Sequence, residues 1–142
     1  MEMKAEIFLP DDYRPAEDEP FMNPRQLEYF RRKLLAMKEE ILDESRLTLV
    51  ALQESGGNYA DVTDRASEES DRTLELRIRD RQRKLIAKVD AALRRIETGD
   101  YGYCEATGEP ISLKRLDARP TTTLSLEAQE RHERREKLHR DT

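Results

Sequence analysis

Four positions in the last third of the chain have the spacing of a zinc site without its residue types. Structural zinc sites often follow the pattern C-x2-C, then about 15–20 residues, then a second C-x2-C. Here Cys104 and Thr107 occupy the first pair of positions and Ser125 and Ala128 the second, with 17 residues between Thr107 and Ser125. Hydroxyl and methyl groups are not the thiolate or imidazole ligands that zinc takes. The spacing therefore predicts a zinc-finger-like module that closes without a metal.

A different metal site would combine Cys104 with His132 or His139. The chain has one cysteine and two histidines, so carboxylates would have to complete a four-ligand set, and nothing in the spacing favours that. We expect instead a metal-free module closed by the packing of its larger side chains. Those side chains are Tyr101, Tyr103, Leu113, Leu116 and Leu124.

The segment DVTDRA is the second candidate site, with Asp61 and Asp64 three residues apart and Ala66 after them. Two acids at the start of a helix often serve only as a cap and as partners of the helix dipole. Alternatively, a long rigid element presents them to a basic or metal-bearing site of a partner. Residues 54–72 hold six acidic residues against two basic ones, a net charge of −4. Both interpretations stand on these residues alone.

A basic stripe is the third candidate, because four cations recur at i, i+4, i+7 and i+11, on one face of a helix. They are Arg77, Arg81, Lys84 and Lys88. One interpretation pairs them with acids of a neighbouring helix, namely Glu39, Glu40, Asp43 and Glu44. The other adds the module's cations and makes a basic notch for a multiply charged anion. Those further cations are Lys114, Arg115 and Arg119.

Two long helices are expected to carry the acidic segment and the basic stripe. Apolar residues spaced by three and four run through Leu27, Phe30, Leu34, Met37 and Ile41, and again through Leu74, Ile78, Leu85, Val89, Ala92, Leu93 and Ile96. Asn23 and Pro24 suit the N-cap and first position of the first helix, and Gly56 and Gly57 suit its end. The pattern predicts an antiparallel coiled-coil hairpin over residues 23–99 with its tip near residues 57–65.

The remaining segments complete an all-α fold. Pro10, Pro15 and Pro20 predict an extended N-terminal arm over residues 1–22. Residues 100–142 are expected to form the degenerate zinc-finger-like module and then a C-terminal helix opened by Ser125.

Composition limits the class of function. Of the 142 residues, 40% are charged and 36% hydrophobic, which suits long helices with a narrow apolar stripe. A net charge of −5 disfavours direct DNA binding and favours a protein partner. The sequence contains no apolar stretch of about 20 residues, the length that a membrane-spanning helix needs. With one cysteine and no leader pattern, we expect a cytoplasmic protein. No nucleophile with a base and an orienting group stands out, so we expect no enzyme.

In this order, several motifs resemble the DksA branch of the DksA/TraR family of bacterial transcription factors. They are FMNPRQLEYFRRKL, DVTDRASEES, LELRIRDRQRKLI, GDYGYCE and RLDARPTTTLSLEAQ, spread over most of residues 20–130. The resemblance implies a monomer that binds RNA polymerase and inserts the hairpin into its secondary channel. Together with the alarmone ppGpp, such a factor represses ribosomal RNA promoters and activates some amino-acid biosynthesis promoters.

The resemblance also assigns residues. It implies that Asp61, Asp64 and Ala66 form the functional coiled-coil tip, and that Arg81 contacts the polymerase rim. The ppGpp site falls on Leu85, Lys88 and Arg119, with Gln129 where the family usually has a basic residue. The four zinc cysteines fall on Cys104, Thr107, Ser125 and Ala128, which is typical of a cysteine-poor, zinc-independent version.

Two other functions compete with this interpretation. A transcript cleavage factor of the Gre type also sends an acidic coiled coil down the secondary channel, although the sequence of the tip favours the DksA branch. A helical scaffold protein would need no tip chemistry at all.

Overall fold

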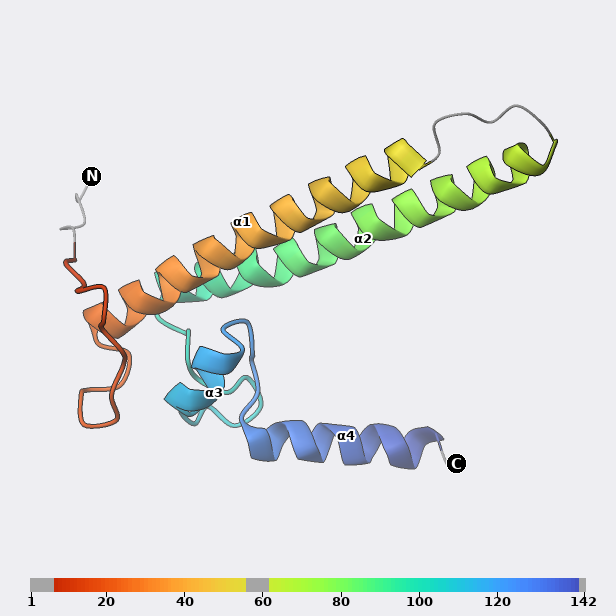
Figure 1. Ribbon diagram of the computed structural model, residues 1–142. Helices are drawn as coiled ribbons and strands as arrows, with labels where there is room; N and C mark the ends of the chain where they lie inside the picture. The colour runs from red at the N-terminus through yellow and green to blue at the C-terminus, as the bar shows by residue number, and fades with distance from the viewer. Residues whose placement is uncertain (1–6, 56–61, 141–142) are drawn as a thin grey trace. The chain divides into compact units, whose positions relative to one another are not determined.

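Four helices make up the regular structure of this protein (Figure 1). The computed structural model describes residues 7–55 and 62–140, and at residues 55 and 62–65 it describes the backbone alone. The helices are α1 (Pro24–Ser55), α2 (Val62–Thr98), α3 (Leu113–Ala118) and α4 (Leu126–Arg140). The described ranges hold no strand, only an isolated bridge between Tyr103 and Pro110. The prediction of an all-α fold is therefore confirmed.

Helix α1 begins where its cap residues predict. Pro24 is the first helical residue, and the side-chain oxygen of Asn23 accepts the N–H of Arg25 at 2.9 Å and of Gln26 at 3.1 Å. A carboxamide oxygen at the N-cap satisfies donors that have no partner within the helix, and proline at the first position removes another. The start of the hairpin is thus set by local chemistry.

The chain divides into two compact units. The globular unit comprises residues 1–34 and 92–142, and the hairpin unit comprises residues 35–91, so α1 and α2 each contribute to both. The predicted division into arm, hairpin and module follows the secondary structure instead and stays a prediction about domain organisation.

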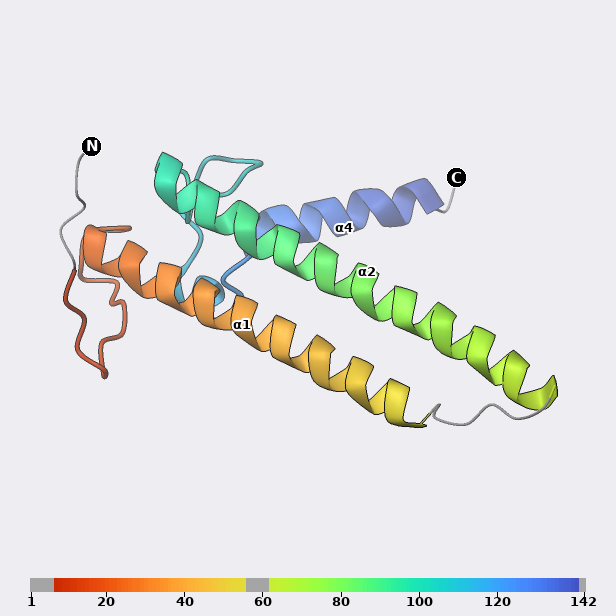
Figure 2. The ribbon, with the colours of Figure 1, turned by 90° about the horizontal axis from the view of Figure 1, so that it is seen from above.

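Within the hairpin unit, α1 and α2 run antiparallel side by side, as both views show (Figures 1 and 2). Ile41 and Val89 are its buried apolar residues. Lys38 Nζ lies 2.9 Å from Asp90 Oδ1 and joins the two helices. Leu74 of the predicted seam is 45% exposed, so the apolar contact is thin toward the beginning of α2. The residues 56–61 between the helices, including Asp61, lie outside the described residues.

The arm is attached to the first turn of α1 in the globular unit. The buried Gln26 side chain accepts the N–H of Met22 at 2.8 Å and donates to the carbonyl of Ala16 at 3.2 Å. The Met22 side chain rests against Gly102, where a Cβ atom would lie 2.9 Å from its terminal methyl carbon. With a φ of 92° as well, position 102 requires glycine. The arm is therefore a folded part of the globular unit.

The core of the globular unit joins α1 to the module. Phe30 and Leu34 from α1 are buried, as are Tyr101, Ile111 and Leu116, and the rings of Phe30 and Tyr101 lie 5.6 Å apart. Leu113 is buried as predicted, whereas Tyr103 and Leu124 are only half-buried. The module thus closes around fewer side chains than the sequence predicts and borrows Phe30 from α1.

A polar connection fastens α3 to α1 in the same unit. Asp117 Oδ1 accepts hydrogen bonds from the Tyr29 hydroxyl and from Lys33 Nζ, both at 2.6 Å. Partial burial opposes ionisation of Asp117, yet these two donors hold the pKa of its carboxyl below the usual value. Burial and the same carboxylate raise the pKa of Tyr29 to about 12. The connection therefore stays charged and intact throughout the neutral range.

None of the helices in the described ranges is long and apolar enough to cross a membrane.

Candidate functional site

Residues 100–111, on both sides of Cys104, form a tight turn that we call the knuckle. The N–H of Cys104 donates to Glu109 O and the N–H of Gly108 donates back to Cys104 O, both at 2.8 Å, while the N–H of Ile111 donates to Gly102 O at 2.7 Å. Gly108 has a φ of 75°, which glycine adopts without strain. These backbone bonds place positions 104 and 107 in one turn, in which Cys104 is buried and Thr107 is exposed.

The second pair of positions lies at the start of α4. Ser125 is the N-cap, because its Oγ accepts the N–H of Ala128 at 3.2 Å. This confirms the predicted helix start. Ala128 is 5% exposed and is the buried residue of α4. Thr107 and Ser125 both lie near enough to Cys104 to lower the pKa of its thiol, so the structure brings three of the four predicted positions together.

The environment of Cys104 favours a thiolate. The residue is 2% exposed, and burial acts to raise the pKa of its thiol. Hydrogen bonds from the side chains and backbone N–H groups of Thr107 and Ser125 outweigh burial and lower that pKa to about 6. The hydroxyls of Thr107 and Ser125, at two of the four predicted ligand positions, thus stabilise the thiolate form of Cys104.

This donor set does not fit zinc. Cys104 is the one thiol, the hydroxyls of Thr107 and Ser125 are not ligands of the usual kind, and Ala128 has no donor atom. Nor do the described residues contain any group of three or more His, Cys, Asp or Glu side chains placed to hold a metal. His132 pairs instead with Glu136 of its own helix at 3.1 Å. Any closure by metal would need ligands that this arrangement does not supply.

Hydrogen bonds connect separate segments of the module. The Tyr101 hydroxyl donates to Pro120 O at 2.7 Å, and Arg115 Nε donates to Leu124 O at 2.9 Å. The backbone N–H of Glu105 donates to Thr123 O at 2.8 Å. Together they tie the knuckle and α3 to the segment that leads into Ser125. From the sequence, Arg115 was a candidate cation of a basic notch; its bond to the Leu124 carbonyl could not be predicted, because charge alone does not reveal a carbonyl partner.

The basic stripe lies exposed along α2 in the hairpin unit. Lys84 pairs with Asp80 of its own helix at 3.0 Å. Among the described residues, Arg77, Arg81 and Lys88 take part in no ion pair, and the acids predicted to face them across the hairpin do not reach the stripe. The cross-hairpin pairing interpretation is therefore wrong for this stripe. Three of its four cations, Arg77, Arg81 and Lys88, are thus exposed without an ion pair to the residues that the structure describes.

The residues assigned to ppGpp come from both units. Leu85 is half-buried and Lys88 exposed in the hairpin unit. Arg119, in the globular unit, is exposed and ends α3, and its N–H donates to Arg115 O. Gln129 donates to Glu133 on α4 at 3.1 Å.

The tip residues are described in part. Asp61 lies outside the described residues, Asp64 is helical in its backbone, and Ala66 is exposed. Since α2 begins at Val62, Asp64 and Ala66 belong to its first turns.

Comparison with known proteins identifies the family. Residues 26–96 match the family described as DnaK suppressor protein DksA, N-terminal domain, and residues 99–134 match the prokaryotic dksA/traR C4-type zinc finger. An RNA polymerase-binding transcription factor DksA from Caulobacter vibrioides is 72% identical over 92% of both chains. The chain belongs to the DksA family.

Two further DksA proteins resemble this chain at lower sequence identity. The factor of the same name from Escherichia coli strain K12 is 42% identical, covering 89% of this chain and 84% of its own. The solved structure of transcription factor DksA2 from Pseudomonas aeruginosa has a TM-score of 0.73 and 42% identity, covering 82% of this chain and 90% of that one. The DksA fold is therefore shared, although this chain keeps one of the four cysteines of the C4-type finger.

Proposed function

We propose that this chain is a regulator of transcription that binds RNA polymerase through the secondary channel and acts there by its coiled-coil tip. The 72% identity to an RNA polymerase-binding factor over 92% of both chains carries the proposal. The exposed, unpaired Arg77 and Arg81 add to it, because exposed cations without internal partners suit contact with a protein surface of opposite charge. In this proposal Arg81 contacts the rim, and Asp61, Asp64 and Ala66 act near the active centre.

The tip is tested by in vitro transcription from a ribosomal RNA promoter. We expect Asp64→Asn to abolish repression while polymerase affinity stays within about twofold, because a single tip charge adds little to a large interface. Glu69→Gln, at an exposed acid of the same helix, is the matched control and should repress normally. Full repression by Asp64→Asn would refute the tip mechanism. Cleavage of stalled transcripts would favour a factor of the Gre type.

The proposal includes ppGpp as an effector bound through Leu85, Lys88 and Arg119. A nucleotide with several phosphates suits cations that have no internal partner, and Lys88 and Arg119 meet that description among the described residues. Lys88→Ala should remove the added effect of ppGpp and keep the effect seen without it. Lys84→Ala, at the cation paired with Asp80, is the matched control. Equal ppGpp responses from both variants would contradict this site.

The proposal also includes a metal-free module in a monomeric protein of the cytoplasm that does not bind DNA and has no enzymatic activity. Its physical basis is the poor fit of Cys104, Thr107, Ser125 and Ala128 to zinc. Purified protein should contain well under one zinc per chain by metal analysis, and its thermal midpoint should not change in chelator. Stoichiometric zinc would overturn this part.

A further inference from the structure

Arg95 organises the end of α2 through its backbone. Its carbonyl accepts the N–H of Asp100 at 2.9 Å and that of Tyr101 at 3.1 Å, while the N–H of Gly99 donates to Ile96 O at 3.4 Å. With Gly99 at a φ of 84°, this is a Schellman motif in which Arg95 is the third residue from the end. The chain leaves the helix and enters the knuckle directly over the Arg95 side chain.

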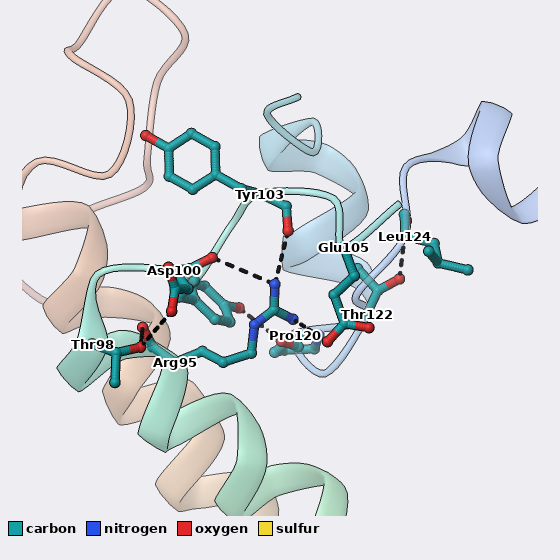
Figure 3. Close-up of polar contacts among 9 residues, drawn as sticks. Arg95, Thr98, Asp100, Tyr103, Glu105, Pro120, Thr122 and Leu124 are labelled. Carbon is teal, nitrogen blue, oxygen red and sulfur yellow. Dashed lines mark hydrogen bonds and ion pairs between the residues drawn. The ribbon is translucent and has the colours of Figure 1, made fainter. Parts of the chain in front are cut away.

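The same side chain then grips the knuckle (Figure 3). One terminal nitrogen of Arg95 donates to Tyr103 O at 2.8 Å and to Asp100 O at 3.4 Å. The other lies 3.7 Å from Glu105 Oε1. The Arg95 side chain is 17% exposed, so these contacts are partly shielded from water. Cys104 stands between two of its partners in sequence, so one guanidinium holds both sides of the cysteine.

A C4-type zinc ion would hold the same piece of chain. In such a finger the metal bonds two residues of the knuckle and two of the opposite segment, here residues 120–128, and these four bonds close the module. Here Arg95 fixes the knuckle to α2, and the N–H of Glu105 carries the connection on to Thr123 O at 2.8 Å. Arg115 reaches the opposite segment at Leu124 O.

We infer that Arg95 is the positioning residue that holds the knuckle on the end of α2, so that the bonds of Glu105 and Arg115 to the opposite segment close the module without a zinc ion. The inference deepens the proposed metal-free state and rests on it. A planar cation with several donors suits this role, because it can bond two carbonyls and a carboxylate at once.

The single cysteine provides the test, since thiol labelling then reports on the module alone. Labelling of the full-length chain with iodoacetamide at pH 8 measures how often buried Cys104 becomes exposed. We expect Arg95→Met to speed labelling roughly 10- to 100-fold, as losing hydrogen bonds to a charged group implies. Far-UV circular dichroism should stay near that of the wild type, because the paired helices remain.

Two variants accompany this measurement. Arg94→Met removes a neighbouring arginine that is exposed on the same helix, and its labelling rate should stay within about twofold of the wild type. Arg95→Lys should fall between, because an ammonium lacks the planar fork. Equal labelling of Arg95→Met and Arg94→Met would overturn the inference.

The replacement of zinc is tested by restoring the ligands. Thr107→Cys, Ser125→Cys and Ala128→Cys together recreate four cysteines, and in this background with zinc the Arg95→Met change should alter the rate of limited proteolysis less than twofold. Failure to take up zinc, or an undiminished effect of Arg95→Met, would refute the replacement. Stoichiometric zinc in the wild-type chain would instead refute the proposed metal-free state. The labelling comparison would still test whether the contacts of Arg95 hold the knuckle.

Discussion

The two units of the molecule differ in how far some of their charged side chains reach, although the globular unit also holds local pairs such as Arg31 with Glu28. In the globular unit, Arg95, Arg115 and Lys33 contact groups of other segments, and Lys33 and Asp117 are 84 residues apart in sequence. In the hairpin unit, charged residues mostly pair three or four positions away on their own helix, as Arg79 does with Glu75 and Lys84 with Asp80. Local pairs of this kind add little stability.

The difference teaches where each unit obtains its specificity. Of the eleven buried apolar residues in the part of the chain that the structure describes, nine belong to the globular unit, so its charged contacts supplement an apolar core. The hairpin unit has two, and its exposed charges stay hydrated and accessible to a partner. One unit is thus organised to hold a shape and the other to offer a surface.

The largest expected contrast comes from the same truncation in each unit. Leu116→Ala should lower the free energy of unfolding by about 2–5 kcal/mol, because Leu116 is fully buried and a cavity remains. Leu76→Ala, at a residue 68% exposed in the hairpin unit, should cost under about 0.5 kcal/mol. Urea unfolding measures both. Equal losses would remove the distinction between the two units.

An intermediate effect is expected from pH at Cys104. The pKa of its thiol in the fold, about 6, lies below the ordinary value of 9.0, so the stabilisation is fully present above pH 9 and is lost as the pH falls through about 6. Between these limits, the wild type should lose up to about 1.4 kcal/mol per pH unit relative to Cys104→Ala. Urea unfolding at pH 6, 7.5 and 9 checks this. A constant gap between the two proteins would show that folding does not lower the pKa of this thiol.

The smallest contrast compares one ion pair from each unit. Asp117→Asn should cost about 1–2 kcal/mol, since it weakens two hydrogen bonds that fasten α3 to α1. Asp90→Asn should cost about 0–1 kcal/mol, because among the described residues Asp90 has the one donor Lys38, whereas Asp117 also accepts the Tyr29 hydroxyl; both ion pairs are more than a third exposed. Thermal unfolding in low and high salt distinguishes them, and the Asp90 variant should approach the wild type more closely as salt rises, because salt does not screen the Tyr29 hydrogen bond. The reverse order would contradict the proposed division of labour.

The helices could be predicted from local sequence. Asn23 and Pro24 mark the start of α1 through bonds within three residues, and Ser125 does the same for α4. The apolar spacing identified Phe30, Leu34 and Val89 as buried residues. Such features depend on residues close together in the sequence, so they can be predicted from the sequence alone.

The closure of the module could not be predicted in the same way. Arg95 and Arg115 bond to backbone carbonyls, which every residue possesses, so no residue type identifies the partner. Gln26 is buried for the same kind of reason, with backbone partners at Met22 and Ala16. The sequence showed that three ligands were absent, but only the fold shows what fills their place.

The start of α2 at Val62 has a thermodynamic consequence for recognition. Because Asp64 and Ala66 are helical before any partner arrives, their backbones rise by about 1.5 Å per residue along a common axis. Ordering a flexible residue costs about 1–2 kcal/mol of backbone entropy, and folding has already met that cost at these two positions. In the proposed function, a partner that contacts these two residues would not have to order their backbone.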